Sequence, residues 1–360
     1  MKILSFTKVF EDVTKQGVKI PANLYLEKGL YPIVDQGQSE IAGYINEKDG
    51  IFKDVPVIIF GDHTRIIKFI DTPFFLGADG VKVLKSIIKE VDYKYLYYVL
   101  LNAKIPDTGY NRHFKWLKEI EIPLPSLGEQ KEIADRLDKV NSLIEKRKTQ
   151  LSKLDQLIKS RFIEMFGNIE SCDNTIDLQD ICLKITDGSH NPPAGIDFSN
   201  NYMISSQNIH DNIIEYRDVR FLSDNDFQIE DKRTSIGLGD VLLTIVGAIG
   251  RTAIVKDDLN ITCQRSVCVI HPNKDKVNST FLKYMLDDLS EIIINEARGV
   301  AQKGIYLNQV KKLQVICPQI EQQNKFADFV QQIDKSKFAV QKSIDKLEIL
   351  KKSLMQQYFG

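Results

Sequence analysis

The sequence predicts an α+β protein: two similar mixed α/β domains separated by two long antiparallel coiled-coil helices, with a pseudo-twofold internal repeat. Three observations predict this fold: a repeat that aligns without gaps, a coiled-coil pattern of apolar residues inside it, and strand-like segments before each copy. The predicted order is a globular domain at 1–124, a helix at 125–167, a second domain at 168–317 and a second helix at 318–360.

The repeat is clearest in the two helical segments. Residues 125–167 align with 318–360 without a gap, and 11 of the 43 positions are identical. Gln130 recurs as Gln323, and both copies close on Phe-Gly. Ser-Leu-Gly-Glu at the start of the first copy is a capping-box pattern, and its closing glycine is a natural helix stop. The sequence therefore indicates a duplicated helical unit.

Apolar residues in each copy follow the four-three spacing of a coiled-coil seam. Each copy spans about 40 residues, or ~60 Å at 1.5 Å per residue, which is long for a helix of a compact domain. We therefore expect the helices to pair with each other; the alternative is that each packs on its own domain. The predicted seam comprises Ile133, Leu137, Val140, Ile144, Leu151, Leu154, Ile158, Phe326, Val330, Ile333, Val340, Ile344, Leu347 and Leu354.

The globular segments resemble each other more weakly and are rich in predicted strands. Their alignment pairs Arg65 with Arg251 and Tyr98 with Tyr284. Branched and aromatic residues between Gly and Asp turns predict strands at 55–60, 68–70, 81–84, 241–246, 252–255 and 266–270. Short helices are expected at 92–103 and 278–289. Because the domains have diverged more than the helices, we expect the domains to determine specificity and the helices to set the distance between the domains.

Composition predicts a soluble, cytoplasmic protein. The 360 residues include 48 basic and 49 acidic ones, and 43% are hydrophobic. No apolar stretch approaches the ~20 residues of a membrane span, and the start has no signal-peptide core. The five cysteines include no CxxC, so neither disulfides nor a metal site is expected. Cys263 and Cys268, with His271 nearby, are expected on opposite faces of one strand as buried thiols.

Several strings in this order resemble the specificity subunits of Type I restriction-modification systems across essentially the whole chain. They are IPLPSLGEQKEIADRLD and KLDQLIKSRFIEMFG around the first helix, ITDGSHNPP and GDVLLTIVGAIGRTAIV in the second domain, and GVAQKGIYLNQVKKLQVICP before the second helix. The resemblance implies two target-recognition domains on two conserved helices, without catalytic activity. It also implies double-stranded DNA, two methyltransferase subunits and restriction subunits as partners. The start of the second helix, PQIEQQNKFAD, departs from the family pattern.

An enzymatic reading is disfavoured by the motifs themselves. Asn191-Pro-Pro resembles an amino-methyltransferase motif, but Ala194 replaces the aromatic ring that would stack on the target base. The glycine pairs around 237–250 flank a strand rather than open a helix, and no Walker loop is present. We therefore expect no cofactor in this chain: S-adenosylmethionine, ATP and Mg would belong to partner subunits. A stand-alone methyltransferase remains a third option.

The charge of the second domain is unusual for a DNA-binding protein. Residues 168–317 carry 15 basic and 21 acidic side chains. Phosphate contacts supply most sequence-independent affinity, so the chain alone should hold DNA weakly and its partners should complete the basic clamp. The near-neutral charge also keeps open a second class of function, a coiled-coil scaffold whose domains bind protein.

Residue type and position give the candidate base-reading side chains. Arginine pairs with guanine and Asn or Gln with adenine, and two domains at fixed separation would read two half-sites across an unread spacer. For each candidate the alternative is an exposed turn residue or a satisfied loop hydrogen bond. The candidates are His63, Arg65, Asn111, Arg112, Ser189, His190, Gln207, Asn208, Arg251, Gln264, Arg265, Gln302 and Lys303. Tyr95, Tyr97 and Tyr98 could stack on bases, but core packing is favoured for Tyr95 and Tyr98. Leu143 and Leu157, outside the seam, are candidate partner contacts or else widen the helix pair.

Overall fold

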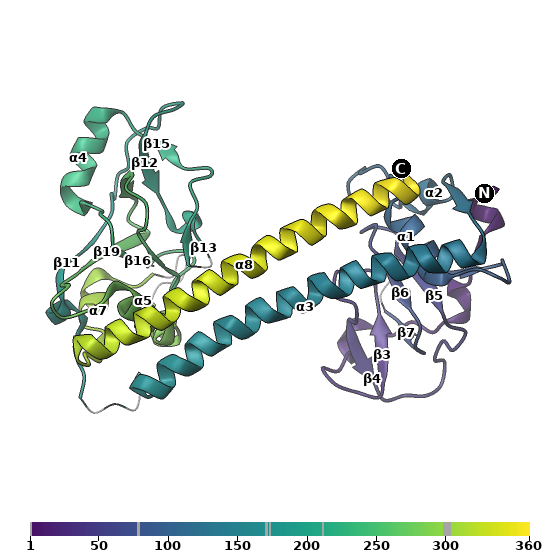
Figure 1. Ribbon diagram of the computed structural model, residues 1–360, viewed down its shortest axis with the longest axis horizontal. Helices are drawn as coiled ribbons and strands as arrows, with labels where there is room; N and C mark the ends of the chain where they lie inside the picture. Colours follow the sequence, from purple (N-terminus) through teal and green to yellow (C-terminus); the bar gives the residue numbers. More distant parts are fainter. Residues whose placement is uncertain (1, 78–79, 170–171, 173, 211, 298–303) are drawn as a thin grey trace. The chain divides into compact units, whose positions relative to one another are not determined.

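The computed structural model describes residues 2–77, 80–169, 172, 174–210, 212–297 and 304–360. The chain divides into two compact units (Figure 1), one formed by residues 1–149 and 341–360 and the other by residues 150–340. Each unit contains one globular domain and a part of each long helix. None of the helices in the described residues is long and apolar enough to cross a membrane.

In its described residues, the first domain is built from short strands and two α-helices. Its strands are β1 (Lys2–Ser5), β2 (Phe10–Asp12), β3 (Tyr31–Val34), β4 (Gly43–Ile45), β5 (Val57–Gly61), β6 (Ile67–Ile70), β7 (Phe75–Leu76), β8 (Val81–Ser86) and β9 (Glu121–Leu124), and its helices are α1 (Tyr93–Leu101) and α2 (Phe114–Leu117). The strands form sheets in the orders β2-β8-β5-β6, β4-β3-β7 and β1-β9. β3 and β7 are parallel, and the other pairs are antiparallel.

The second domain contains more elements. Its strands are β10 (Ile176–Asp177), β11 (Cys182–Asp187), β12 (Asn201–Ile204), β13 (Ile209–His210), β14 (Ile213–Ile214), β15 (Arg220–Phe221), β16 (Val241–Thr244), β17 (Thr252–Ile254), β18 (Asn260–Cys263), β19 (Val267–Pro272) and β20 (Gln314–Val315). Its helices are α4 (Asp224–Thr234), α5 (Ser279–Asp288), α6 (Ser290–Glu296) and α7 (Leu307–Lys311). The sheet orders are β11-β19-β16-β17, β15-β12-β18, β10-β20 and β13-β14.

The two domains share one topology. The four-stranded sheets correspond strand for strand, with β2, β8, β5 and β6 matching β11, β19, β16 and β17. The three-stranded sheets also correspond, and each contains one parallel pair, β3 with β7 and β12 with β18. The hairpin β13–β14 and the helices α4 and α6 have no counterpart among the described residues of the first domain. The predicted duplication is therefore confirmed at the level of the fold.

Most of the predicted strands and both short helices are present. Burial explains them, since β5 and β16 are buried along their whole length and lie inside their sheets. Tyr95 and Tyr98 are both 1% exposed and belong to the interior, as the helical spacing predicted. The Tyr95 hydroxyl donates to the Pro123 carbonyl at 2.8 Å, and burial raises the pKa of Tyr95 to about 12.

One prediction about the strands was wrong. The segment containing Cys263 and Cys268 is not a single strand but two, β18 and β19, which belong to different sheets. The chain turns at 264–266, where the backbone amide of Val267 donates to the Gln264 carbonyl at 3.0 Å. Both thiols are fully buried, and burial raises the pKa of each. They are therefore interior apolar groups.

The long helices are α3 (Leu127–Phe166) and α8 (Ile320–Phe359). The capping box at the start of α3 is present: the Ser126 amide donates to the Glu129 carboxylate at 2.9 Å, and the Glu129 amide donates to the Ser126 hydroxyl at 3.4 Å. Gly167 adopts φ +78° directly after the last turn. This positive φ suits glycine and ends the helix where the sequence predicted.

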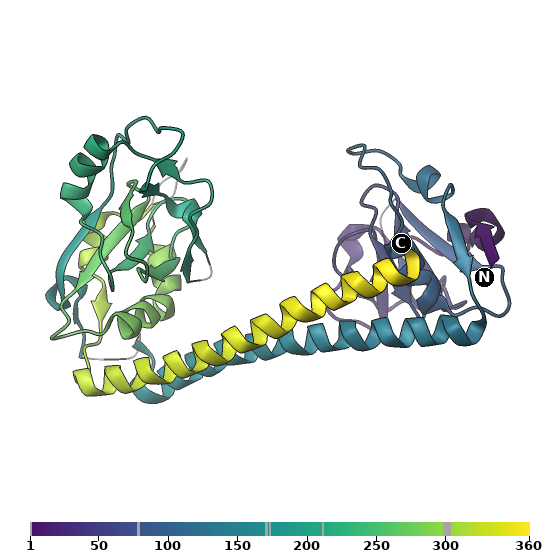
Figure 2. The same cartoon turned by 45° about the horizontal axis from the view of Figure 1, so that its top comes forward.

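Within each unit the helices run side by side and antiparallel (Figures 1 and 2). In the first unit the start of α3 meets the end of α8, where Arg136 Nη1 donates to the Tyr358 hydroxyl at 3.1 Å. In the second unit the end of α3 meets the start of α8, where the rings of Phe162 and Phe326 lie 5.4 Å apart. Between the helices of the second unit, Lys337 of α8 also forms an ion pair with Asp155 of α3 at 2.6 Å.

Every residue of the predicted seam is buried or half-buried. Leu137, Val140, Val340 and Ile344 are among the buried ones. Others serve the domain cores as well: Ile158, Phe326 and Val330 belong to the core of the second domain, and Ile133 packs against the core of the first. The helices thus pair with each other and also close the domain cores, so both packing alternatives occur together.

The repeated glutamine has the same role in both halves. Gln130 is 3% exposed; its Nε2 donates to the Pro125 carbonyl, and its Oε1 accepts from the Asp92 amide, both at 3.0 Å. Gln323 is fully buried and makes the corresponding bonds, to the Pro318 carbonyl at 2.7 Å and from the Asn278 amide at 2.9 Å. Asp92 and Asn278 are the N-caps of α1 and α5. Each glutamine therefore joins a long helix to the helix of its domain.

Candidate nucleic-acid interface

In the first domain, three loops meet beyond the end of β5. The turn between β5 and β6 contacts the loop after β3, because the Thr64 hydroxyl donates to the Gln36 carbonyl at 2.7 Å. The same turn contacts the loop before α2, because the His113 amide donates to the Asp62 carbonyl at 2.7 Å. Four predicted site residues of this domain lie on this turn and on the loop before α2: His63, Arg65, Asn111 and Arg112.

Arg65 sits at a special point of the turn. Its backbone adopts φ +61°, a left-handed conformation that is uncommon for a residue with a side chain. Its guanidinium Nη2 donates to Asp107 Oδ2 at 2.7 Å. The amide of Gly109 donates to the other oxygen of this carboxylate at 3.1 Å. These two hydrogen bonds, that from Gly109 first, lower the pKa of Asp107 below its ordinary value.

An exposed aromatic ring contacts the same turn at His63. Tyr110 is 88% exposed and stacks on the His63 ring with 4.7 Å between centroids and 10° between planes. The His63 amide donates to Gln36 Oε1 at 3.2 Å, whereas its buried Nδ1 has no partner among the described residues. Arg112 is exposed and makes no ion pair within the described residues. Asn111 is exposed too, but its side-chain amide donates to the Thr108 carbonyl.

The second domain places Arg251 in the corresponding turn, between β16 and β17. Its side chain is also held, but by a different element: Nη1 hydrogen bonds to His210 Nδ1 at 2.8 Å and donates to the Ile209 carbonyl at 3.3 Å. Both partners lie on β13, a strand that has no counterpart among the described residues of the first domain. Positive φ angles in this turn fall on Gly247 and on Gly250, which directly precedes the arginine.

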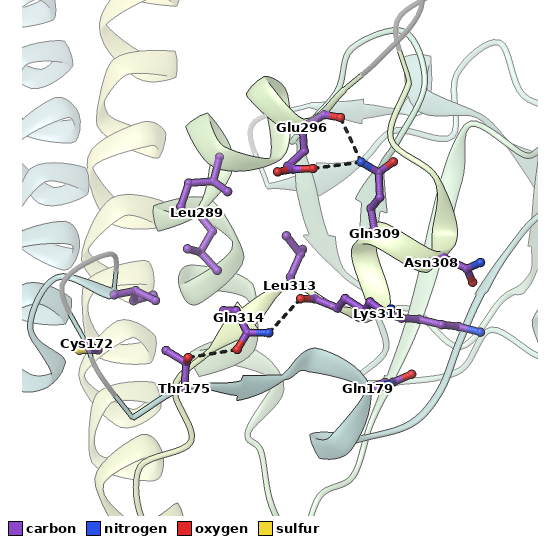
Figure 3. A pocket seen from close by; sticks show the side chains of 13 residues that line it. Cys172, Thr175, Gln179, Leu289, Glu296, Asn308, Gln309, Lys311, Leu313 and Gln314 are labelled. Carbon is purple, nitrogen blue, oxygen red and sulfur yellow. Dashed lines mark hydrogen bonds between the residues drawn. The ribbon is translucent and has the colours of Figure 1, made fainter.

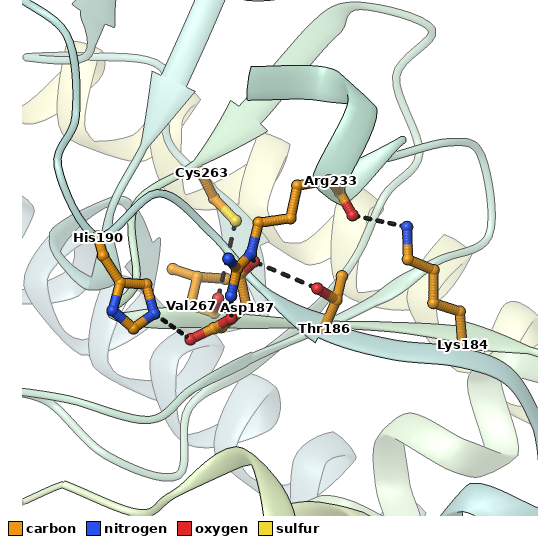
Figure 4. Close-up of polar contacts among 7 residues, drawn as sticks. All are labelled: Lys184, Thr186, Asp187, His190, Arg233, Cys263 and Val267. Atoms are coloured by element: carbon orange, nitrogen blue, oxygen red, sulfur yellow. Dashed lines mark hydrogen bonds and ion pairs between the residues drawn. The ribbon is translucent and has the colours of Figure 1, made fainter. Parts of the chain in front are cut away.

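A polar cluster fixes the loop that follows β11 (Figure 4). The Asp187 carboxylate lies between His190 and Arg233, with His190 Nε2 at 2.8 Å and the Arg233 guanidinium in close contact on the other side. Arg233 Nε also donates to the Asp187 carbonyl at 2.9 Å. Burial opposes ionisation of Asp187, but the hydrogen bonds from Arg233 and His190 together outweigh it and lower the pKa of Asp187. The cluster leaves the His190 side chain 55% exposed.

A polar cavity of about 590 Å³ lies at the same end of the second domain. Gln207, Arg220 and Gln264 line it, together with Ser205 and Ser266. Gln264 stands in the turn between β18 and β19, next to the exposed Arg265. The cavity therefore presents amide and guanidinium groups, which are the groups that recognise base edges.

Two predicted base-reading residues are used inside the protein instead. Asn208 is 5% exposed; its side chain caps the turn by accepting from the Ser205 amide at 2.9 Å, and it donates to the carbonyls of Glu215 and Arg217 at 3.1 Å. Ser189 is 8% exposed and donates to the Glu230 carboxylate at 3.1 Å. Both are better explained as structural. Gln302 and Lys303 lie outside the described residues.

Sequence reasoning missed the residues that hold the candidates in place. Asp107, Tyr110 and Arg233 were not predicted, although the exposed ring of Tyr110 lies within the TGYNR string beside two candidates. Arg220, which lines the polar cavity, was not predicted either. Asp107 and Arg233 each contact a residue more than 40 positions away. A pairing of that kind comes from the folded structure, and the sequence carries no local signal for it.

A larger cavity, of about 1030 Å³, lies elsewhere in the second domain (Figure 3). Its lining combines the apolar Leu289 and Leu313 with Lys311, and Gln309 Nε2 donates to Glu296 Oε2 at 3.0 Å. Gln179, also in the lining, precedes β11, whereas His190 follows it, so this cavity lies at the other end of that strand from the candidate interface. No group of three or more metal-binding side chains occurs in the described residues.

The comparisons with known proteins agree with this architecture. The family described as Type I restriction modification DNA specificity domain matches residues 6–156 and 192–349. The chain belongs to this family. Among curated relatives, the specificity subunit of the Type I restriction enzyme EcoBI from Escherichia coli is 27% identical over 266 residues, which cover 64% of this chain and 54% of that protein.

A second relative and a solved structure extend the comparison. The specificity subunit of EcoR124I/EcoR124II from Escherichia coli is 34% identical over 149 residues, covering 37% of this chain and 36% of that protein. The matches thus span about half or less of these curated relatives. The S subunit of a Type I restriction-modification system from M. genitalium has a TM-score of 0.62 at 16% identity, covering 100% of this chain and 96% of that one. That likeness establishes the fold.

Proposed function

We propose that this chain is the non-catalytic DNA-recognition subunit of a Type I restriction-modification complex. Each domain contacts one half of a bipartite, asymmetric site in double-stranded DNA, and the long helices set the spacer between the halves. The chain recruits two methyltransferase subunits, which methylate adenine, and restriction subunits. S-adenosylmethionine, ATP and Mg act in those partners.

One observation carries the proposal: the same fold occurs twice, and each copy presents an arginine from the same hairpin turn. Arg65 follows β5, and Arg251 follows the corresponding strand, β16. Arginine is the side chain that most often reads guanine in the major groove. Polar side chains surround each arginine, but the surroundings differ between the domains, which fits two different half-sites.

Charge supports a role for partners in holding DNA. The second domain is net acidic by sequence, and the candidate loops carry only a few cations, such as Arg112 and Arg265. The partner subunits therefore supply most phosphate contacts. The partners dock on faces of the helices outside the seam, where Leu143 and Leu157 are each 46% exposed.

The test is the methylation pattern of a host that expresses this chain with its cognate methyltransferase. The expected result is one bipartite motif, in which exchanging the domain at 168–317 for that of another family member changes one half and leaves the other half and the spacer unchanged. Absence of any motif would overturn the proposal and favour a protein-binding scaffold. A salt titration of the purified chain on duplex DNA tests the charge argument, because tight, steeply salt-dependent binding without partners would contradict it.

A further inference from the structure

We propose that Asp107 is a specificity-determining residue that positions Arg65 to select one guanine in the first half-site. This inference rests on the proposed function and adds a residue to it. Asp107 reads no base itself; it acts by fixing the orientation of the arginine and by repelling phosphate.

The geometry around Arg65 is fixed at both ends of its side chain. Its backbone amide donates to the Gly61 carbonyl at 2.7 Å within the hairpin turn. Its guanidinium donates through Nη2 to Asp107 Oδ2 at 2.7 Å. Asp107 is fixed in turn, because its Oδ1 accepts from the Gly109 amide at 3.1 Å. A guanidinium has five N–H donors, and this contact uses one of them.

The loop that carries Asp107 is itself attached to the arginine turn. The Tyr110 ring stacks on His63, two residues before Arg65. At the end of the loop, the Phe114 amide donates to Asp62 Oδ1 at 2.8 Å, and the buried His113 places its ring Nδ1 3.0 Å from the Asp62 carbonyl. Asp107 and Arg65 therefore belong to one connected surface, and the support for the guanidinium is preorganised.

Orientation matters because guanine is recognised by two parallel hydrogen bonds, to O6 and N7. An unsupported arginine can instead turn to any phosphate oxygen, which raises affinity without reading sequence. The Asp107 carboxylate holds the guanidinium plane and also repels the phosphate backbone. Removing it should therefore lower discrimination and raise non-specific binding. These two effects have opposite signs, so simple unfolding cannot mimic them.

The second domain holds its arginine by other means. Within the described residues, Arg251 contacts a histidine nitrogen and a backbone carbonyl and no carboxylate. The effect of Asp107 should therefore be confined to the first half-site. The second half-site serves as an internal reference in the same DNA molecule.

The experiment compares D107A, D107N and R65A in the complex of the full chain with its methyltransferase. The control is D54A, which removes an equally exposed carboxylate of the same domain, one that pairs with Lys85 at 2.6 Å. For D107A we expect the preference for guanine at one position of the first half-site to fall about tenfold, within the range for one bidentate pair. Binding to a random-sequence duplex should tighten. D107N, which keeps an acceptor but loses the charge, should fall between the wild type and D107A.

The outcomes separate this inference from the proposed function. If the wild-type complex methylates no bipartite motif, the proposed function itself is wrong. If the motif is present but R65A leaves it unchanged, Arg65 reads no base and the inference is overturned. The inference is also overturned if R65A changes the motif while D107A matches D54A. If a thermal melt shows that D107A is not folded, the comparison of D107N with the wild type tests the inference instead.

Discussion

Replacing Gln130 with alanine should destabilise the first unit, because this glutamine connects α3 to the N-cap of α1. Alanine would leave the Asp92 amide and the Pro125 carbonyl without their partners in a site where the glutamine is only 3% exposed. A hydrogen bond contributes about 1 kcal/mol net, and each buried group left unpaired costs about 1–3 kcal/mol. Taking about 1–2 kcal/mol for each of the two unpaired groups, we expect the free energy of unfolding to fall by about 2–4 kcal/mol.

Urea denaturation followed by the fluorescence of Trp116 measures this change, since Trp116 is the single tryptophan and lies in the first domain. With a slope of about 2 kcal/mol per molar urea, the midpoint should fall by about 1–2 M. The control is K131A, at the exposed neighbouring position on the same helix. If Q130A unfolds within about 0.5 kcal/mol of K131A, the repeated glutamine is not a structural connection and this reasoning is wrong.

Three further predictions concern other parts of the molecule. Because the pKa of Asp187 is lowered in the folded protein, its carboxylate stabilises the folded state at pH values above the ordinary pKa of an aspartate. This stabilisation is lost as the pH falls through the pKa of Asp187 in the folded protein. Urea midpoints measured from pH 7 to pH 3 should therefore drop more for the wild type than for D187N. F162A should cost about 3–5 kcal/mol, since this ring packs on Phe281 and Phe326; a calorimetric loss below 1 kcal/mol would refute that packing. One additional heptad after Leu151, matched by one in α8, should lengthen the spacer of the methylated motif and leave both half-sites intact; a changed half-site would count against the helices as the spacer.

The sequence predicted the repeated architecture because the signals were local or duplicated. The four-three spacing indicated the helices, and alternating apolar residues indicated buried strands such as β5. The strand β12 was missed, since its pairing with β18 across 59 residues of sequence determines it, and the sequence predicted β18 as the start of a single strand running on to Cys268. The turn at 264–266 was hidden for the same reason: alternation continues through it, although the two strands enter different sheets.

The sequence indicated where the two arginines lie, but not which residues contact them. The alignment of the two halves placed both arginines in corresponding turns, but it could not show what holds them. Asp107 and His210 reach their arginines only through tertiary structure; Asp107 lies on a loop and His210 on the strand β13, and these two segments do not correspond. Asn208 is buried and caps a turn, and a local signal for this role existed: Ser205 stands three residues before it, the spacing at which a side chain caps a turn.

The end of α8 has a consequence for biosynthesis. The Phe359 ring lies 5.6 Å from that of Tyr95, and Asn102 Nδ2 donates to the Phe359 carbonyl at 3.1 Å. A ribosome makes residue 95 long before residue 359, so this face of the first core stays uncovered while some 260 intervening residues are translated. The first domain to be synthesised is thus completed after the second, and a nascent chain stalled before its last turn would expose an aromatic surface to chaperones.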